Sequence, residues 1–155
     1  DDTWYLWYIA GRKWKLVDGR AEPVYKIRMA SSADGIHWSK ANRDLIESRL
    51  EEDEAQASPD VFFANGRYHM FFCYRQSFDF RMNSSRGYRI GHAWSDDLMS
   101  WTREDEHALL DVTPGGWDSD MLCYPHVFKC DGKEYLLYNG NEFGRYGFGL
   151  AVLGR

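Results

Sequence analysis

Tyr5-Leu6-Trp7-Tyr8 is the first of three copies of a short aromatic stretch in this chain. The stretch returns as His69-Met70-Phe71-Phe72, 64 residues later, and as Tyr135-Leu136-Leu137-Tyr138 after a further 66 residues. The second copy follows the turn sequence Asn65-Gly66, and the third follows Asp131-Gly132. A period this regular indicates that the chain is built from equivalent structural units.

Runs of apolar and aromatic residues predict the strands of each unit, and in chain order they occupy 3–10, 24–30, 59–64, 67–74, 88–94, 124–128, 134–138 and 148–151. Residues 11–23 predict a polar, basic loop between the first two strands. Residues 42–57 predict a charged loop with at most one helical turn. Asp34-Gly35 predicts a hairpin turn before a short outer strand at Trp38.

The units share one register. Pro59 is matched by Pro125 and Gly66 by Gly132, and the Ala-to-Trp segment at 30–38 is matched at 93–101. Four-stranded antiparallel units repeated in this way are typical of β-propeller blades. We therefore predict an all-β fold, with one partial propeller domain over residues 1–155.

The predicted domain holds about two and a half blades. Residues 1–45 are expected to end one blade, 46–110 to form a full blade and 111–155 to begin the next. Because incomplete blades leave strand edges unpaired, we expect this chain to be about half of a closed ring. The rest of the propeller or a second chain is then the partner that closes it.

Composition argues against several classes of function. Together, 19 Lys and Arg against 24 Asp and Glu give a net charge of −5, which argues against a nucleic acid partner and against an anionic membrane surface. No apolar run approaches the length of a membrane span. The sequence begins without Met and shows no signal peptide, so we expect a trimmed or partial chain with a cytoplasmic location.

Aromatic residues make up 17% of the chain, which is typical of a β-rich core, although exposed rings also form platforms for sugars. The three cysteines, Cys73, Cys123 and Cys130, are an odd number without a close pairing motif. We interpret them as reduced thiols, with one disulfide and a leftover thiol as the alternative. No Cys or His cluster has the spacing of zinc ligands, so neither a metal nor another cofactor is predicted.

Ile27 to Trp38 reads Ile-x-x-Ala-x-Ser-x-Asp-Gly-x-x-Trp, and a similar segment runs from Ile90 to Trp101. Together with the preceding strand, glycine turn and aromatic strand, this pattern resembles the five-bladed β-propeller glycosidases, the superfamily of glycoside hydrolase families 32, 43, 62, 68, 117 and 130. The chain is most similar to an uncharacterised bacterial group with the motifs Gly-Trp-Asp-Ser-x-Met-x-x-Tyr-Pro and Tyr-Asn-Gly-Asn-x-Phe-Gly. These motifs stand here at 116–125 and 138–144, and the likeness covers nearly the whole chain.

The resemblance implies a partial five-bladed propeller and a glycoside hydrolase of the family 43 type. Characterised members of the superfamily place three acidic residues on three different blades, and the first blades are absent from this chain. The usual acid stands two residues before the strand proline, where this sequence has Ala57 and Cys123. Since neither side chain is a useful proton donor to a glycosidic oxygen, the resemblance implies that the usual acid is missing or displaced.

The antiparallel order of a blade fixes which connections share one end. The segments before each first strand and the loops between each second and third strand meet at one rim, and here they are 9–26, 47–58, 73–89, 113–124 and 139–147. The segments before the first strands also lie nearest the propeller axis. We therefore expect a functional cleft at this rim.

Glycoside hydrolysis needs two carboxyl groups, one on each side of the scissile bond. The candidates on the rim are Asp118 and Asp120, which flank Ser119, and Glu54 from the acidic run 51–54. Asp120 is the first choice for a catalytic or hydroxyl-binding carboxylate. The alternative for Asp118 is a turn cap that binds backbone amides, and the alternative for the acidic run is a solvated loop.

The candidate sugar-binding residues on this rim are polar or flat side chains, namely Tyr74, Arg75, Trp117, Tyr124, His126, Asn139, Asn141 and Arg145. Amides and guanidinium groups suit vicinal hydroxyls or a sugar carboxylate. Further stacking candidates are Phe78, Phe80, Tyr88 and Tyr146, whereas His92 is interpreted as structural. The alternative is that the polar residues only tie down long loops.

Three functions are compatible with the sequence. The first is a glycoside hydrolase that acts on a carbohydrate ligand through paired carboxylates in an axial cleft. The second is a propeller that binds carbohydrate without catalysis, and the third is an interaction or scaffold module. A separation of about 5–10 Å between two carboxyl groups that share one cleft would favour hydrolysis.

Overall fold

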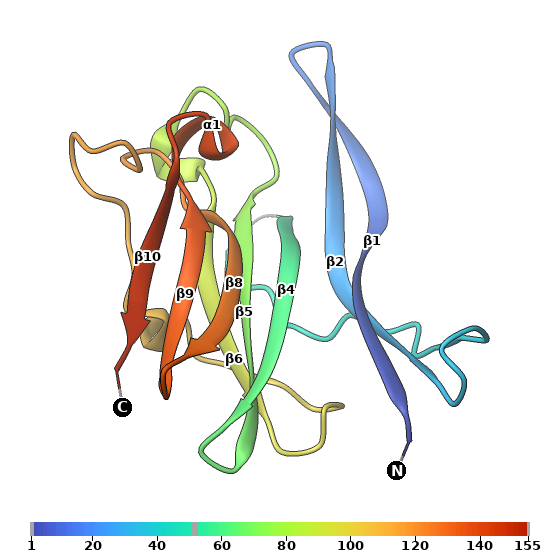
Figure 1. The fold of residues 1–155 in the computed structure, drawn as a ribbon. Coiled ribbons are helices and arrows are strands. Elements are labelled where there is room, and N and C mark those ends of the chain that lie inside the picture. The colour runs from blue at the N-terminus through green and yellow to red at the C-terminus, as the bar shows by residue number, and fades with distance from the viewer. Residues whose placement is uncertain (1, 51–52, 155) are drawn as a thin grey trace.

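The computed structural model describes residues 2–50 and 53–154, which form three antiparallel β-sheets (Figure 1). The first sheet contains β1 (Trp4–Val17), β2 (Arg20–Ser32) and β3 (Ser39–Lys40). The second contains β4 (Glu54–Ala64), β5 (Arg67–Gln76), β6 (Arg89–Ser95) and β7 (Thr102–Arg103). The third contains β8 (Cys123–Cys130), β9 (Lys133–Asn139) and β10 (Phe148–Leu153). Within each sheet, strands that are consecutive in the chain are paired, so the predicted antiparallel meanders are confirmed.

Helical structure in the described part of the chain is limited to short turns, namely η1 (Ser84–Arg86), η2 (Asp105–Ala108) and α1 (Asn141–Gly144). The two central residues of α1, Glu142 and Phe143, have positive φ angles of 52° and 61°, so this segment is an irregular turn. None of the helices in residues 2–50 and 53–154 has the length and apolar character needed to cross a membrane.

The three sheets stand side by side, with the β4–β7 sheet in the middle (Figure 1). β4 contacts β2 on one side and β8 on the other. Alternation along β5 supplies the core of both interfaces. Met70 and Phe72 pack with Ile27 of the first sheet, whereas Phe71 packs with Leu136 of the third. The chain is therefore a partial β-propeller of antiparallel blades.

Two-residue turns connect the first strand pair of each sheet, and they are Asp18-Gly19, Asn65-Gly66 and Asp131-Gly132. Both residues of each turn have positive φ, 48–51° at the first position and 74–82° at the glycine. This is the type I′ geometry that matches the twist of a hairpin. The predicted loop over 11–23 is wrong, because β1 continues to Val17 and forms a long hairpin with β2. This hairpin extends past the top of the two neighbouring sheets (Figure 1).

The prediction of a loop over 42–57 is wrong at its end, because β4 already begins at Glu54. A register shift between Ala57 and Asp60 lets the strand pass through Ser58 and Pro59, which do not pair with β5. Residues 42–50 contain no helical turn. The first two residues of the acidic run, 51 and 52, lie outside the described part of the chain.

The repeated Ser-x-Asp segments form equivalent loops before the outer strands. The Asp34 carboxylate accepts bonds from the backbone N–H of Ile36 at 2.9 Å and of His37 at 2.8 Å. The Asp97 carboxylate does the same for residues 99 and 100, at 2.8 and 2.7 Å. Asp34-Gly35 lies in the loop that joins β2 to its antiparallel neighbour β3, so the predicted hairpin before a short outer strand is confirmed. Its connection is a longer loop that a carboxylate closes.

Candidate functional site

A cavity of about 290 Å³ lies at the end of the molecule that carries α1, at the top of Figure 1. We term it the rim pocket. Its lining comes from all three sheets, and it consists of Pro23, Tyr25, Arg75, Phe80, Arg81, Tyr88, Tyr124 and Phe143. These residues belong to four of the five segments that the blade topology places at one rim, so chain segments far apart in sequence form one site here.

Arg75 is the most deeply buried charged group of the rim pocket, with 2% of its surface exposed. Its Nε donates to the Tyr88 hydroxyl at 3.1 Å, and its two terminal nitrogens donate to the carbonyls of Gln76 at 2.9 Å and Pro23 at 3.2 Å. The guanidinium carbon lies 3.7 Å from the centre of the Phe80 ring. Stacking and forked hydrogen bonds together fix the orientation of the guanidinium.

Tyr25 and Tyr88 connect the first two sheets beside Arg75 through a hydrogen bond between their hydroxyl groups. Burial, and secondarily the neighbouring Tyr25, raises the pKa of Tyr88 far above its ordinary value. The Tyr88 hydroxyl is therefore neutral over the whole physiological pH range. The Phe80 ring meets Tyr88 edge-on, with 6.0 Å between the ring centres. This part of the pocket is aromatic, with hydroxyl groups in fixed positions.

Tyr124, Phe143 and Arg81 surround the mouth of the rim pocket. A bulge between Cys123 and His126 turns Tyr124 outward, and 47% of this residue is exposed. Its ring centre lies 6.3 Å from that of Phe143. Arg81 lies over the Phe80 ring at 4.6 Å and forms an ion pair with Glu22 at 3.0 Å. Flat rings beside a guanidinium fork suit a polyhydroxylated ring.

The loop before β8 is held against β9 and α1 by three of the predicted site residues. Asp118 is 2% exposed and accepts a bond from the Tyr138 hydroxyl at 3.3 Å. Trp117 stacks on the same Tyr138 ring, 5.7 Å between centres. The Asn141 side chain accepts from the backbone N–H of Asp120 at 2.7 Å. None of these groups lines the rim pocket, and the Asn141 bond corresponds to the loop-tying alternative. Asp118 is bonded to the Tyr138 hydroxyl, and its other carboxylate oxygen is buried without a partner among the described residues, so it is not the predicted cap on backbone amides.

Asp120 is placed differently from Asp118. Its side chain is exposed and bonds only to the Ser119 hydroxyl, at 3.0 Å, among the groups of the described residues. Its backbone carbonyl accepts from Arg89 at 3.1 Å, which ties it to the strand that follows Tyr88. Of the three predicted catalytic carboxylates, Asp120 is the one with a solvent-accessible side chain at this rim.

Glu54 is fully buried and does not line the rim pocket. One of its oxygens lies 2.7 Å from Arg103 and also accepts from Gln56 at 2.7 Å. The other accepts from the backbone N–H of Arg49 at 3.0 Å and of Leu50 at 3.3 Å. With both oxygens bonded inside the protein, the structure gives Glu54 the position of an internal ion-pair partner.

Tyr74 projects from the opposite face of β5 to Arg75. Its ring packs against the core between the first two sheets, with the Arg103 guanidinium 4.4 Å from its centre. The Asn139 amide donates to the carbonyl of Phe143 at 3.2 Å and shapes the turn after β9. Arg145 lies on the surface, in an ion pair of 2.7 Å with Glu142. These three predicted residues also lie outside the rim pocket.

His126 lies on β8 and is exposed, with its Nδ1 atom 3.3 Å from the carboxylate of Asp60. Asp60 also accepts the backbone N–H of Val127 at 2.5 Å, so it connects the two innermost strands β4 and β8. Asp60 was not among the residues predicted from the sequence. A signal was present, because Asp60 and His126 occupy equivalent repeat positions, directly after Pro59 and Pro125.

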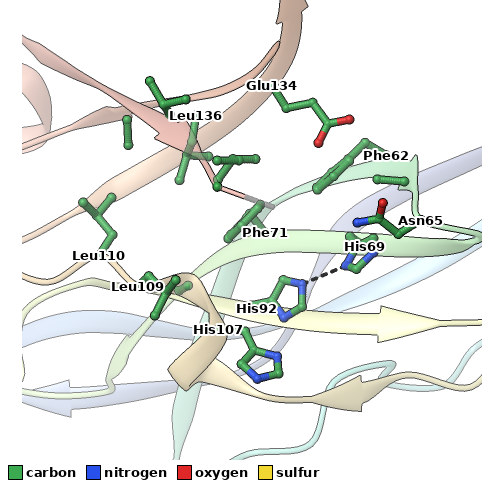
Figure 2. Close-up of a pocket in the computed structure, with 16 residues that line it drawn as sticks. Phe62, Asn65, His69, Phe71, His92, His107, Leu109, Leu110, Glu134 and Leu136 are labelled. Carbon is green, nitrogen blue, oxygen red and sulfur yellow. Dashed lines mark hydrogen bonds between the residues drawn. The ribbon is translucent and has the colours of Figure 1, made fainter. Parts of the chain in front are cut away.

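A second cavity, of about 230 Å³, lies between the second and third sheets (Figure 2). Three histidines line it, and the Nδ1 of His69 lies 3.0 Å from the Nε2 of His92. The His92 and His107 rings are 5.9 Å apart. Leu136 and Phe71 supply the apolar wall. Burial, together with the neighbouring imidazoles, lowers the pKa of His92 to about 4, so it is neutral at pH 7.

The cysteines are unbridged, and two of them lie behind the rim pocket. Burial raises the pKa of Cys73 to about 11 and that of Cys123 to about 12. Both thiols are therefore protonated and weakly nucleophilic. Within residues 2–50 and 53–154, no group of three or more His, Cys, Asp or Glu side chains is arranged to hold a metal ion.

Half of the rim pocket was predicted from the sequence, and the rest was missed. Arg75 and Tyr124 were predicted to bind the ligand, and Phe80 and Tyr88 to stack on it. Tyr25, Arg81 and Phe143 were missed, and so was Pro23. Phe143 stands inside the Tyr-Asn-Gly-Asn-x-Phe-Gly motif and Arg81 directly follows a named aromatic residue, whereas nothing in the alternation of β2 distinguishes Tyr25.

Comparison of the sequence with known proteins finds uncharacterised relatives. No protein-family model matches the chain. An uncharacterized protein of Mycobacterium tuberculosis (strain ATCC 25618 / H37Rv) is 38% identical over 151 residues, and so is its counterpart in strain CDC 1551 / Oshkosh. The alignment covers 97% of this chain and 47% of the relative, so the chain spans about half the length of the curated relatives it matches.

Solved structures of glycoside hydrolases share the blade arrangement. A family 117 enzyme of Zobellia galactanivorans, Zg3597, superposes with a TM-score of 0.71 at 18% identity over 98% of this chain and 48% of its own. A thermostable family 43 enzyme gives 0.70 at 15% identity, over 97% and 54%. The fold is that of propeller glycoside hydrolases. The Bombyx mori family 32 β-fructofuranosidase BmSUC1, solved as a point mutant in complex with sucrose, gives 0.64 at 18% identity, over 97% and 31%.

Proposed function

We propose that this glycosidase-like propeller binds a carbohydrate in the rim pocket, and that the complete protein is a glycoside hydrolase. The observation that carries the proposal is the convergence of aromatic rings, fixed hydroxyls and two guanidinium groups from three sheets in one cavity. Aromatic faces bind the apolar side of a sugar ring, while fork-shaped donors bind its hydroxyls. The glycoside hydrolases that share the fold, one of them solved with sucrose, support the same class of ligand.

The lining of the rim pocket indicates which catalytic groups must come from other parts of the complete protein. None of its eight lining residues carries a carboxyl group, so the lining of the rim pocket supplies binding, and the catalytic carboxyl groups must lie beside the pocket. Two carboxyl groups are needed for hydrolysis. Asp120 is the candidate from this chain, and we propose that the second carboxyl group comes from the part of the protein that the relatives have in addition.

The binding half of the proposal is tested with Tyr124→Ala in the full-length protein. Loss of an exposed ring at the mouth of the pocket is expected to weaken binding on a glycan array, and in calorimetry with the best glycan, by about tenfold. Phe63→Ala is the matched control, because Phe63 is 61% exposed but stands next to the turn at the opposite end of the blade. Equal binding by both variants and the unmodified protein would place the carbohydrate elsewhere.

The catalytic half is tested with Asp120→Asn and a panel of aryl glycosides. Because the side chain is exposed, the change is expected to leave the unfolding midpoint nearly unchanged while it abolishes release of the aryl group. An unmodified protein that binds glycans but hydrolyses none of the panel would favour the second candidate function, a non-catalytic carbohydrate-binding propeller. Ala57 and Cys123 at the positions of the usual acid support that candidate.

A further inference from the structure

The charge of Arg75 has no counter-ion in the part of the chain that the structure describes. Its three side-chain hydrogen bonds go to one hydroxyl and two carbonyl oxygens, and none goes to a carboxylate. A guanidinium has five N–H donors, so two of them have no acceptor among the described residues. Burying a cation without an anion is costly, and a site tends to retain one only where an anion completes it.

The other buried arginine of the same sheet shows the contrast. Arg103 is nearly as deeply buried, at 5% exposure against 2% for Arg75, and its guanidinium contacts two carboxylates, Glu54 at 2.7 Å and Asp105 at 2.9 Å. Both guanidinium groups also lie over aromatic rings, Arg75 over three at 3.7 to 5.5 Å and Arg103 over two at 4.4 and 5.1 Å, so the carboxylates are what distinguishes them. The two arginines also differ in position, because Arg75 lines the rim pocket and Arg103 does not.

A second guanidinium reinforces the positive character of the cavity. Arg81 lies at the mouth, and 39% of its side chain is exposed. The Glu22 carboxylate pairs with Arg81 at 3.0 Å and also with Arg20 at 3.7 Å. Glu22 does not line the rim pocket, and the lining includes no acidic residue. Glu22 therefore offsets part of the Arg81 charge from outside the cavity, whereas the charge of Arg75 is left for an anionic group that enters the pocket.

We infer that the rim pocket recognises a sugar that carries a carboxylate, a uronic acid unit of a glycan, with Arg75 and Arg81 as its anion-binding residues. This inference rests on the proposed carbohydrate binding and adds the class of sugar. A carboxylate has the planar, two-oxygen shape that an arginine fork binds in bidentate fashion. A cavity of about 290 Å³ is at the small end of ligand pockets and accommodates roughly one sugar ring.

The test compares each acidic glycan with a neutral copy of itself. Oligosaccharides of galacturonate, glucuronate and mannuronate, and the methyl ester of each, are titrated calorimetrically into the full-length protein at low and high salt. We expect at least one acid to bind tenfold or more tightly than its ester, with a preference that declines as salt rises. Sulfated and phosphorylated monosaccharides form a third arm, and tighter binding of either would overturn the assignment to a carboxylate.

Variants then connect the preference to the pocket. Arg81→Gln is expected to remove most of the difference between acid and ester, whereas Arg145→Gln, which changes a surface arginine outside the pocket, is expected to leave it intact. Arg75→Lys keeps the positive charge but loses the fork and is expected to weaken the acid more than the ester. Thermal unfolding of each variant monitors the fold.

Failure of this inference is distinguishable from failure of the proposed function. If acid and ester bind equally, and Tyr124→Ala weakens both, the pocket binds carbohydrate but does not select for charge. If no glycan of either kind binds, both proposals are overturned. Because the comparison of acid with ester uses the unmodified protein, the result does not depend on whether an arginine variant folds.

Discussion

Glu54 shows how the burial of a single residue determines what a carboxylate can do. In sequence it belongs to an acidic run that resembles a solvated loop, but in space it is enclosed by four hydrogen-bond donors. A carboxylate with this environment holds β4 against Arg103 of β7. Its expected contribution is therefore to stability and not to catalysis.

We predict that Glu54→Gln lowers the free energy of unfolding by about 3 kcal/mol, because it leaves the buried Arg103 with one carboxylate fewer. Urea denaturation measures the change. Glu106→Gln is the matched control, since Glu106 forms an exposed ion pair with Arg49 at 3.4 Å and its loss is expected to leave the free energy of unfolding nearly unchanged. A Glu54→Gln protein of normal stability that has lost activity would instead return Glu54 to the catalytic candidates.

His92 makes the stability of the fold sensitive to acid. Its folded pKa is about 4, against an ordinary value of 6.5, chiefly because it is buried and also because His69 and His107 face it. Between these two values the unfolded chain binds a proton that the folded chain does not, so stability must fall as the pH drops from about 6.5 to about 4. The carboxylate that lines the same cavity, Glu134, lies close to His69.

We predict that the free energy of unfolding declines by up to about 3 kcal/mol over this pH range, and that His92→Gln flattens the decline. Urea titrations at pH 7.5, 6.5, 5 and 4 measure both proteins. The variant is expected to be less stable than the unmodified chain at pH 7.5, where it loses the bond to His69. An equally steep decline in the two proteins would show that other groups dominate acid sensitivity.

The paired strands of each sheet are joined by turns of the same type. Asn65-Gly66 and Asp131-Gly132 were recognised from sequence as hairpin turns, and the positive φ angles at both positions explain why Asn or Asp precedes Gly. The same signal at Asp18-Gly19 was hidden, because basic residues on either side of it resembled a loop. Propensity alone therefore missed a strand that cross-strand pairing with β2 makes regular.

For the Asn65-Gly66 hairpin turn, we predict that Gly66→Ala destabilises the chain by about 1–2 kcal/mol, because alanine at a φ of 82° is strained. Gly11→Ala is the control, since Gly11 has an ordinary φ and no atoms within 4 Å of an added methyl group. It is expected to be neutral within about 0.5 kcal/mol in thermal or urea unfolding. Equal effects of the two substitutions would contradict the type I′ geometry.

At the scale of the whole molecule, the two outermost sheets each present an apolar face. On β10, Ala151 and Leu153 pack toward the middle sheet, whereas Phe148 and Leu150 are 71% and 56% exposed. On β1, Leu6 is 45% exposed. Faces of this kind occur where another blade or subunit packs, and both strands also have an unpaired edge.

We predict that the 155-residue chain associates with itself in a concentration-dependent way, which sedimentation velocity measures. The double variant Leu6→Lys/Leu150→Lys is expected to shift the equilibrium to monomer. Leu109→Lys is the control, because Leu109 is 89% exposed on a loop and belongs to neither face. A chain that stays monomeric up to millimolar concentration would show that these faces need no partner.

The architecture can be predicted without coordinates, because the sequence signals for it are local and repeated. Strand alternation, Asn/Asp-Gly turns and the return of Pro59 as Pro125 depend on neighbouring residues, so they can be read without coordinates. They predicted three antiparallel sheets and, through antiparallel order, the end of the molecule at which the connections meet.

Which side chains at that end share a cavity depends on how the three sheets pack together. Arg75 and Tyr74 are adjacent in the chain, but strand alternation sends them to opposite faces of β5. Asp118 and Asp120 are separated by one residue, and packing against Tyr138 buries the first while the second remains exposed. Tyr25 enters the site from another sheet. Burial and contact between distant segments are properties of the folded chain, and therefore no local pattern could assign the site completely.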